Sequence, residues 1–140
     1  MKVKAAMTEK VEVVSPETLL QEAAQMMKSL DAGVLPVCDG ERLVGMLTDR
    51  DMTVRAAAEG KDPKATHVSE AMSLEVVYCF EDQDVEEAAD LMADKQIRRL
   101  PVLSRDKQLV GIVSLSDLAV EGTGKKNTGA ALKNISQPAL

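Results

Sequence analysis

The stretches GMLTDRD at 45–51 and GIVSLSD at 111–117 decide the fold of this chain. Each has a glycine, a Thr or Ser three residues later and an Asp six residues later. Working back from them at an offset of 65, LPV at 35–37 matches LPV at 100–102, and EAA at 22–24 matches EAA at 87–89. The offset becomes 66 between Gly45 and Gly111, so one residue is gained at a turn. Ordered matches of this kind indicate one unit written twice in tandem.

Each copy predicts the same order of elements. A short β-rich run, 11–14 or 76–79, is followed by a helix. Ser15-Pro16-Glu17 is typical of a helix start, and the acidic run 81–84 favours the N-terminus of the second copy's helix. Apolar residues recur with helical spacing at 20, 23, 24, 27 and 30, and again at 85, 88, 89 and 92.

Two apolar strands follow in each copy. Strands 34–38 and 43–47 flank Asp39-Gly40, and strands 100–103 and 109–113 flank Arg105-Asp106, which predicts two hairpins. A second helix is expected from Thr48 to about Ala58, with its counterpart beginning at Ser114.

The predicted fold is therefore α/β (α+β), with two tandem β-α-β-β-α units. One unit is too small to be stable alone, so we expect the two to pack about a pseudo-two-fold axis. The predicted domains are residues 1–60 and 70–121, with a linker at 61–69 and a flexible tail at 122–140.

Composition excludes several classes of protein. The net charge is −6, and the only aromatic residues are Tyr78 and Phe80, which argues against a nucleic-acid partner. No apolar run could cross a membrane and no signal core is visible, so we expect a soluble cytosolic protein. Cys38 and Cys79 lie far apart in sequence and only one His is present, so no zinc framework is expected. We expect both thiols to be buried and inert.

Catalytic motifs are also missing from the sequence. There is no nucleophile elbow, HExxH or GxGxxG, and Gly124-Lys125 is followed by Lys126 where a P-loop needs Ser or Thr. We expect a regulatory protein rather than an enzyme, with no required cofactor.

The duplicated unit, with LPV before the hairpin and Gly-x-x-[Thr/Ser]-x-x-Asp after it, resembles a tandem pair of CBS domains, known as a Bateman module. The resemblance covers about residues 3–120. The whole chain also resembles small stand-alone bacterial members of the hypoxic-response type.

The resemblance implies a ligand site. Such modules commonly bind AMP, ADP, ATP or S-adenosylmethionine in clefts between the two copies. Their motif Asp contacts the ribose hydroxyls and their Thr or Ser contacts phosphate, which implicates Thr48 with Asp51 and Ser114 with Asp117. A basic residue before the Leu-Pro can reach phosphates, and Arg99 holds that place where copy one has Val34.

Two alternatives stay open at these residues. A Thr or Ser followed three residues later by an acidic residue is also a capping box, which serves the helix itself, and both roles can coexist. Arg98 and Arg99 could instead pair with acidic neighbours such as Asp94 or Asp117. Because adjacent strand residues point to opposite faces, at most one of them lines a cleft, and the resemblance favours Arg99.

Two functions follow. The first is a sensor that binds an adenosine-containing ligand and acts in trans on a protein partner. The second is a ligand-independent homodimeric scaffold, since CBS pairs usually form dimers. The sequence names neither the ligand, the occupied cleft, the partner nor a redox role for the cysteines.

Overall fold

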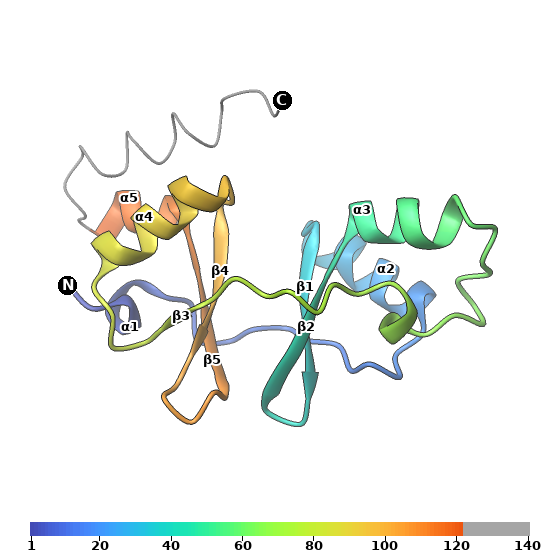
Figure 1. The fold of residues 1–140 in the computed structure, drawn as a ribbon, viewed down its shortest axis with the longest axis horizontal. Coiled ribbons are helices and arrows are strands. Elements are labelled where there is room, and N and C mark those ends of the chain that lie inside the picture. Colours follow the sequence, from blue (N-terminus) through green and yellow to red (C-terminus); the bar gives the residue numbers. More distant parts are fainter. Residues whose placement is uncertain (122–140) are drawn as a thin grey trace. The chain divides into compact units, whose positions relative to one another are not determined.

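The computed structural model describes residues 1–121, and the predicted tail at 122–140 lies outside them. The chain divides into two compact units (Figure 1). One consists of Glu12–Val76, and we call it the first unit. The other combines Met1–Val11 with the chain from Val77 onward, and we call it the second unit.

The two units contain corresponding elements. Those of the first unit are α2 (Leu20–Leu30), β1 (Val34–Asp39), β2 (Arg42–Thr48), α3 (Asp49–Asp51), the π-helix η1 (Met52–Ala57) and the 3₁₀ helix η2 (Val68–Glu70). Those of the second unit are α1 (Val3–Ala6), β3 (Cys79–Phe80), α4 (Val85–Lys95), β4 (Arg99–Leu103), β5 (Leu109–Ser114) and α5 (Leu115–Glu121). This mixture of helices and strands confirms the predicted α+β class.

Both predicted hairpins are present. β1 pairs antiparallel with β2, and β4 pairs antiparallel with β5. The first turn uses Gly40 at φ +64°, a backbone conformation that glycine adopts without steric cost. The register shifts after Val37 in one hairpin and after Val102 in the other, which are equivalent positions of the repeat. The duplication therefore extends to backbone irregularities.

The predicted start of the first helix was wrong. α2 begins at Leu20, and Ser15–Thr18 forms a turn in which the Ser15 amide donates to the Thr18 hydroxyl at 3.0 Å. Ser15 is therefore engaged locally, five residues before the helix. In the second unit the acidic run does reach the helix start, because α4 begins directly after Asp84.

The β-rich runs before these helices are shorter than predicted. In the first unit only Val14 bridges to Val37, in parallel. In the second unit β3 has two residues and pairs in parallel with β4. A run of β-branched residues favours extended backbone. Only those residues whose backbone groups hydrogen-bond to a neighbouring strand become part of the sheet.

Each unit has its own core of aliphatic side chains. The first unit's core includes Leu20, Leu35 and Leu47, and the second unit's core includes Met92 and Leu100. In Figure 1, α4 and α5 lie beside each other next to β4.

The N-terminal segment of each sequence copy packs into the other copy's unit. Val3 and Ala6 lie in the core of the second unit, while Val68 and Ala71 lie in the core of the first. The compact units therefore divide differently from the predicted domains at 1–60 and 70–121. The sequence repeat sets the predicted boundaries, whereas packing assigns the segment at the start of each copy to the core of the other copy's unit.

Backbone hydrogen bonds fix the N-terminal segments of the two copies, one containing Thr8 and the other Met72 and Ser73. We call them the crossed segments, because each pairs with the hairpin of the other copy. Thr8 and Ile112 exchange amide-to-carbonyl bonds of 2.8 and 3.0 Å, and Ser73 and Met46 exchange bonds of 2.8 and 3.0 Å. The predicted linker at 61–69 is also held, because the Leu20 amide donates to the Thr66 carbonyl at 2.9 Å and Thr66 is buried.

The motif glycines allow this close approach. A Cβ added at Gly111 would lie 2.8 Å from the Thr8 carbonyl oxygen and 2.6 Å from the Met7 sulfur, and one at Gly45 would lie 2.9 Å from the Ser73 carbonyl oxygen. A carbon atom so near a backbone oxygen forces the segment to move away. Glycine at these positions is thus a packing requirement.

We expect Gly111→Ala to destabilise the protein by about 1–3 kcal/mol, because the added methyl group overpacks the contact with Met7 and Thr8. Urea unfolding measures this change. Adding Met7→Ala should restore only part of the loss, since the Thr8 carbonyl still opposes the methyl group. Full restoration by Met7→Ala would contradict the role given to the backbone contact.

Burial suppresses the acidity of both thiols. It raises the pKa of Cys79 to about 12 and raises that of Cys38, and both cysteines are free and almost fully buried. At pH 8 both groups are therefore neutral, and the thiolate is the reactive species. We expect no labelling of the native protein by a maleimide within minutes at pH 8, and complete labelling in denaturant. Prompt labelling of either cysteine in the native protein would contradict this.

Candidate functional site

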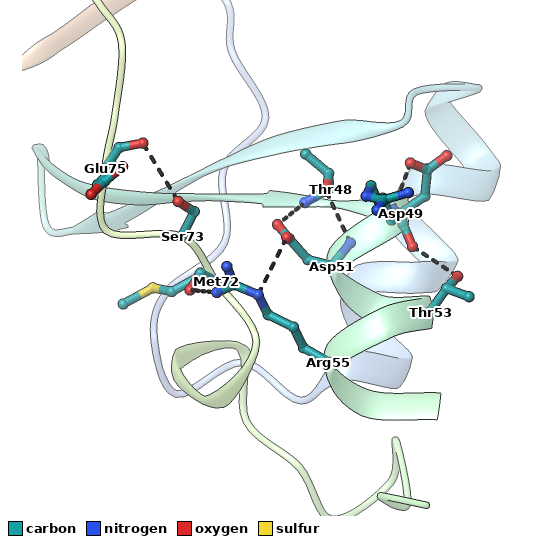
Figure 2. Close-up of polar contacts among 9 residues, drawn as sticks. Thr48, Asp49, Asp51, Thr53, Arg55, Met72, Ser73 and Glu75 are labelled. Atoms are coloured by element: carbon teal, nitrogen blue, oxygen red, sulfur yellow. Dashed lines mark hydrogen bonds and ion pairs between the residues drawn. The ribbon is translucent and has the colours of Figure 1, made fainter. Parts of the chain in front are cut away.

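The first predicted pair, Thr48 and Asp51, joins the end of β2 to the start of α3 (Figure 2). The Thr48 amide donates to Asp51 Oδ2 at 2.9 Å, and the Asp51 amide donates to Thr48 Oγ1 at 3.0 Å. This is a complete capping box, so the capping role is present in the geometry. Both side chains are half-buried.

Arg55 adds a contact that the sequence reading missed. Its Nε lies 3.8 Å from Asp51 Oδ1, and its Nη1 donates to the Met72 carbonyl at 3.1 Å (Figure 2). The guanidinium therefore bridges the Asp51 carboxylate and the crossed segment beside Ser73. The spacing of four residues between Asp51 and Arg55 on a predicted helix was the signal that could have revealed this pair.

The second predicted pair repeats the capping geometry. The Ser114 amide donates to Asp117 Oδ2 at 2.8 Å, and the Asp117 amide donates to Ser114 Oγ at 3.1 Å. Ser114 Oγ also lies 2.9 Å from Ser116 Oγ, which places two hydroxyl groups together. Within residues 1–121, no cation lies at ion-pair distance from Asp117.

Arg99 is brought next to this pair by the strand register. It is the first residue of β4 and pairs directly with Ser114, the last residue of β5, just as Val34 pairs with Thr48. Directly opposed residues of an antiparallel pair point to the same face. Arg99 is exposed, and across the described part of the chain neither it nor Arg98 forms an ion pair with Asp94 or Asp117.

The structure thus groups the five predicted residues into two sets. Thr48 and Asp51 lie in the first unit, and Arg99, Ser114 and Asp117 lie in the second. Each set offers a hydroxyl group and a carboxylate held by backbone amides, and the second adds the exposed guanidinium of Arg99. The carboxylate can accept hydrogen bonds from hydroxyl groups, and the guanidinium can bind a phosphate.

The sequence analysis also did not predict a second polar cluster, formed by Asp82, Arg105 and the Phe80 ring. Arg105 donates from Nε and Nη2 to the two oxygens of Asp82, both at 2.8 Å, and stacks 4.1 Å from the centre of the Phe80 ring. This pairing lowers the pKa of the Asp82 carboxyl group and raises that of Arg105. Both charged groups are exposed, so we assign the cluster to holding the β4–β5 turn against the loop before α4.

Residues 1–121 contain no group of three or more His, Cys, Asp or Glu side chains arranged to hold a metal ion. None of the helices in that range has the length and apolar character needed to cross a membrane.

Several solved structures resemble this one. That of hypoxic response protein I with two coordinated zinc ions has a TM-score of 0.78 and 36% identity, covering 87% of this chain and 99% of that one. That of CBSX2 in complex with AMP has a TM-score of 0.74 and 27% identity, covering 86% and 94%. The CBS-domain pair of protein MJ0100, in complex with 5′-methylthioadenosine and S-adenosylmethionine, has a TM-score of 0.72 and 25% identity, covering 86% and 94%.

Sequence comparison agrees with these likenesses. The CBS-domain-containing protein YhcV of Bacillus subtilis is 48% identical over 96% of this chain and 94% of its own length. The family model of the CBS domain matches residues 3–57 and again 68–122, which together include both capped helices. The chain therefore belongs to the CBS-domain family and contains two such domains in tandem.

Proposed function

We propose that this CBS pair is a regulatory module, not an enzyme, that binds an adenosine-containing ligand and acts in trans on a protein partner. Its ligand class is AMP, ADP, ATP or S-adenosylmethionine. The observation that carries the proposal is the matched presentation of a hydroxyl–carboxylate pair at the same backbone position of both repeats. The ligand-bound structures of CBSX2 and MJ0100 support this ligand class.

The carboxylates supply the ribose contact. Asp51 and Asp117 are each held by one backbone amide, which fixes the orientation of the carboxylate before any ligand arrives. An ionised carboxylate accepts hydrogen bonds from two adjacent hydroxyl groups, and preorganisation lowers the entropic cost of forming them. Capping and ligand binding can therefore use different lone pairs of the same side chain.

Arg99 supplies the phosphate contact in the second unit. Its guanidinium starts from the position opposite Ser114 and is exposed, so it can turn toward a phosphate near that hydroxyl group. In the first unit the corresponding Val34 offers no charge. We therefore assign a phosphate-bearing ligand to the residues of the second unit.

A homodimeric scaffold that needs no ligand is the second candidate. The observation that favours it is that both capping boxes are complete, so each Thr or Ser and each Asp already has a structural role. The exposed Val54 on η1 leaves an apolar side chain on the helix that follows the motif. The cytosolic location and the partner in trans stay predictions in either case.

We expect thermal-shift assays with AMP, ADP, ATP and S-adenosylmethionine to raise the melting temperature for at least one of them. A ligand at about 100 times its Kd adds roughly 2.7 kcal/mol, which shifts a domain of this size by several degrees. Asp117→Asn should remove most of the shift, because Asn can still accept the Ser114 amide but loses the charge that orients the diol. Asp106→Asn, on an exposed turn, is the matched control.

A separate variant tests whether Arg99 contacts the phosphate of the ligand. Arg99→Val copies the residue of the first unit, and we expect it to weaken AMP binding by about tenfold while leaving adenosine binding within about twofold, since charge-assisted hydrogen bonds to phosphate contribute roughly 1.5–3 kcal/mol. Isothermal titration calorimetry measures both. Equal weakening of AMP and adenosine would count against a phosphate contact at Arg99.

The scaffold makes a different prediction. If it is correct, light scattering should show a dimer whose dissociation constant no adenosine ligand changes, and no ligand should alter the melting temperature. A melting shift that Asp117→Asn abolishes would exclude the ligand-independent function.

A further inference from the structure

The two carboxylates that we assign to ligand binding have different surroundings. In the first unit both oxygens of Asp51 are engaged, Oδ2 by the Thr48 amide and Oδ1 by Arg55. In the second unit Oδ2 of Asp117 accepts from the Ser114 amide. Across residues 1–121, Asp117 Oδ1 has no hydrogen bond and no ion pair. The first carboxylate is thus already occupied by a side chain of the same chain.

Arg55 is held in place at a second point. Its Nη1 donates to the Met72 carbonyl at 3.1 Å, and Met72 belongs to the crossed segment that pairs with β2 through Ser73 (Figure 2). A guanidinium fixed by a backbone carbonyl has already lost much of its side-chain freedom, so contact with Asp51 costs little further entropy. This anchoring makes Arg55 a persistent competitor for the carboxylate.

The repeat gives the second unit no equivalent. At the offset of 66 residues, Arg55 corresponds to Glu121, so the cation of the first copy is replaced by an acidic residue. The position of Arg50 corresponds to Ser116, whose hydroxyl group lies against Ser114. The backbone geometry of the capping boxes is shared, and the difference lies in these side chains.

We propose that Arg55 is a specificity-determining residue that reserves the Asp51 carboxylate, so that a ribose-bearing ligand occupies the Asp117 carboxylate first. The inference rests on the proposed function. A diol binding at Oδ1 of Asp51 must displace the guanidinium of Arg55, whereas no side chain of residues 1–121 holds Oδ1 of Asp117 by a hydrogen bond or ion pair. The two repeats are therefore unequal toward the ribose as well as toward phosphate.

The test uses adenosine, which carries the diol but no phosphate, titrated calorimetrically into the full chain. We expect Asp117→Asn to weaken adenosine binding at the tighter site by about tenfold, because losing a hydrogen bond to a charged group reduces affinity by roughly tenfold or more. Asp51→Asn should leave the affinity of that site within about twofold. 2′-Deoxyadenosine lacks one of the two hydroxyl groups. Its affinity should therefore no longer differ between the Asp117→Asn and Asp51→Asn variants. Circular dichroism and thermal melting check that each variant is folded.

The role of Arg55 is measured in the Asp117→Asn background, where only the first carboxylate remains. Arg55→Gln should tighten adenosine binding there by about threefold, the size expected from an exposed i,i+4 ion pair. Arg50→Gln is the matched control, because Arg50 lies in α3, directly before the η1 segment that carries Arg55. It is exposed, and within residues 1–121 its side chain forms no ion pair. It should leave the affinity unchanged.

Three results would overturn the proposal. The tighter site could disappear in Asp51→Asn rather than Asp117→Asn, which would reverse the order of the sites. Arg55→Gln and Arg50→Gln could give equal affinities, which would remove the role of the guanidinium while leaving the proposed function intact. The wild-type chain could fail to bind adenosine, AMP and S-adenosylmethionine, which would overturn the proposed function and this inference together.

Discussion

Two pairs of reciprocal backbone hydrogen bonds, between Thr8 and Ile112 and between Ser73 and Met46, determine how this chain becomes two units. Each pair attaches the segment that precedes one repeat to the hairpin of the other. The attachment requires glycine at 111 and 45, because a Cβ there would collide with the carbonyl oxygen of the attached segment. Neither unit's core is complete without the side chains that these segments bring, such as Val3 and Val68.

The same strands then place the candidate site. β2 and β5 each pair with a crossed segment and then end at a Thr or Ser that caps the following helix. The glycine of the motif allows the crossed segment to pair with the sheet. The Thr or Ser and the Asp cap the following helix. A short motif can therefore be required for folding at every one of its positions and still present a fixed carboxylate and hydroxyl group for recognition.

Duplication has kept the backbone and changed the polar side chains around it. The register shifts after Val37 and Val102, the hairpins and the capping boxes correspond closely. Arg99 faces Ser114 where Val34 faces Thr48, and Arg55 holds Asp51 where the second copy has no cation at the matching position. A conserved scaffold with divergent charges is a physical basis for two unequal sites in one chain.

Periodicity and turn chemistry determined the repeat, the α+β class, both hairpins and the capping pairs, because these depend on residues a few positions apart. The start of α2 at Leu20 was predicted too early, since Ser15 and Thr18 satisfy each other in a turn that resembles a helix start in sequence. Only the tertiary structure showed that residues 1–11 belong with the second copy and that Arg55 also reaches the Met72 carbonyl, 17 residues further along the chain. Those facts depend on backbone groups far apart in sequence, and every residue carries the same amide and carbonyl, so the order of the side chains does not record which ones pair.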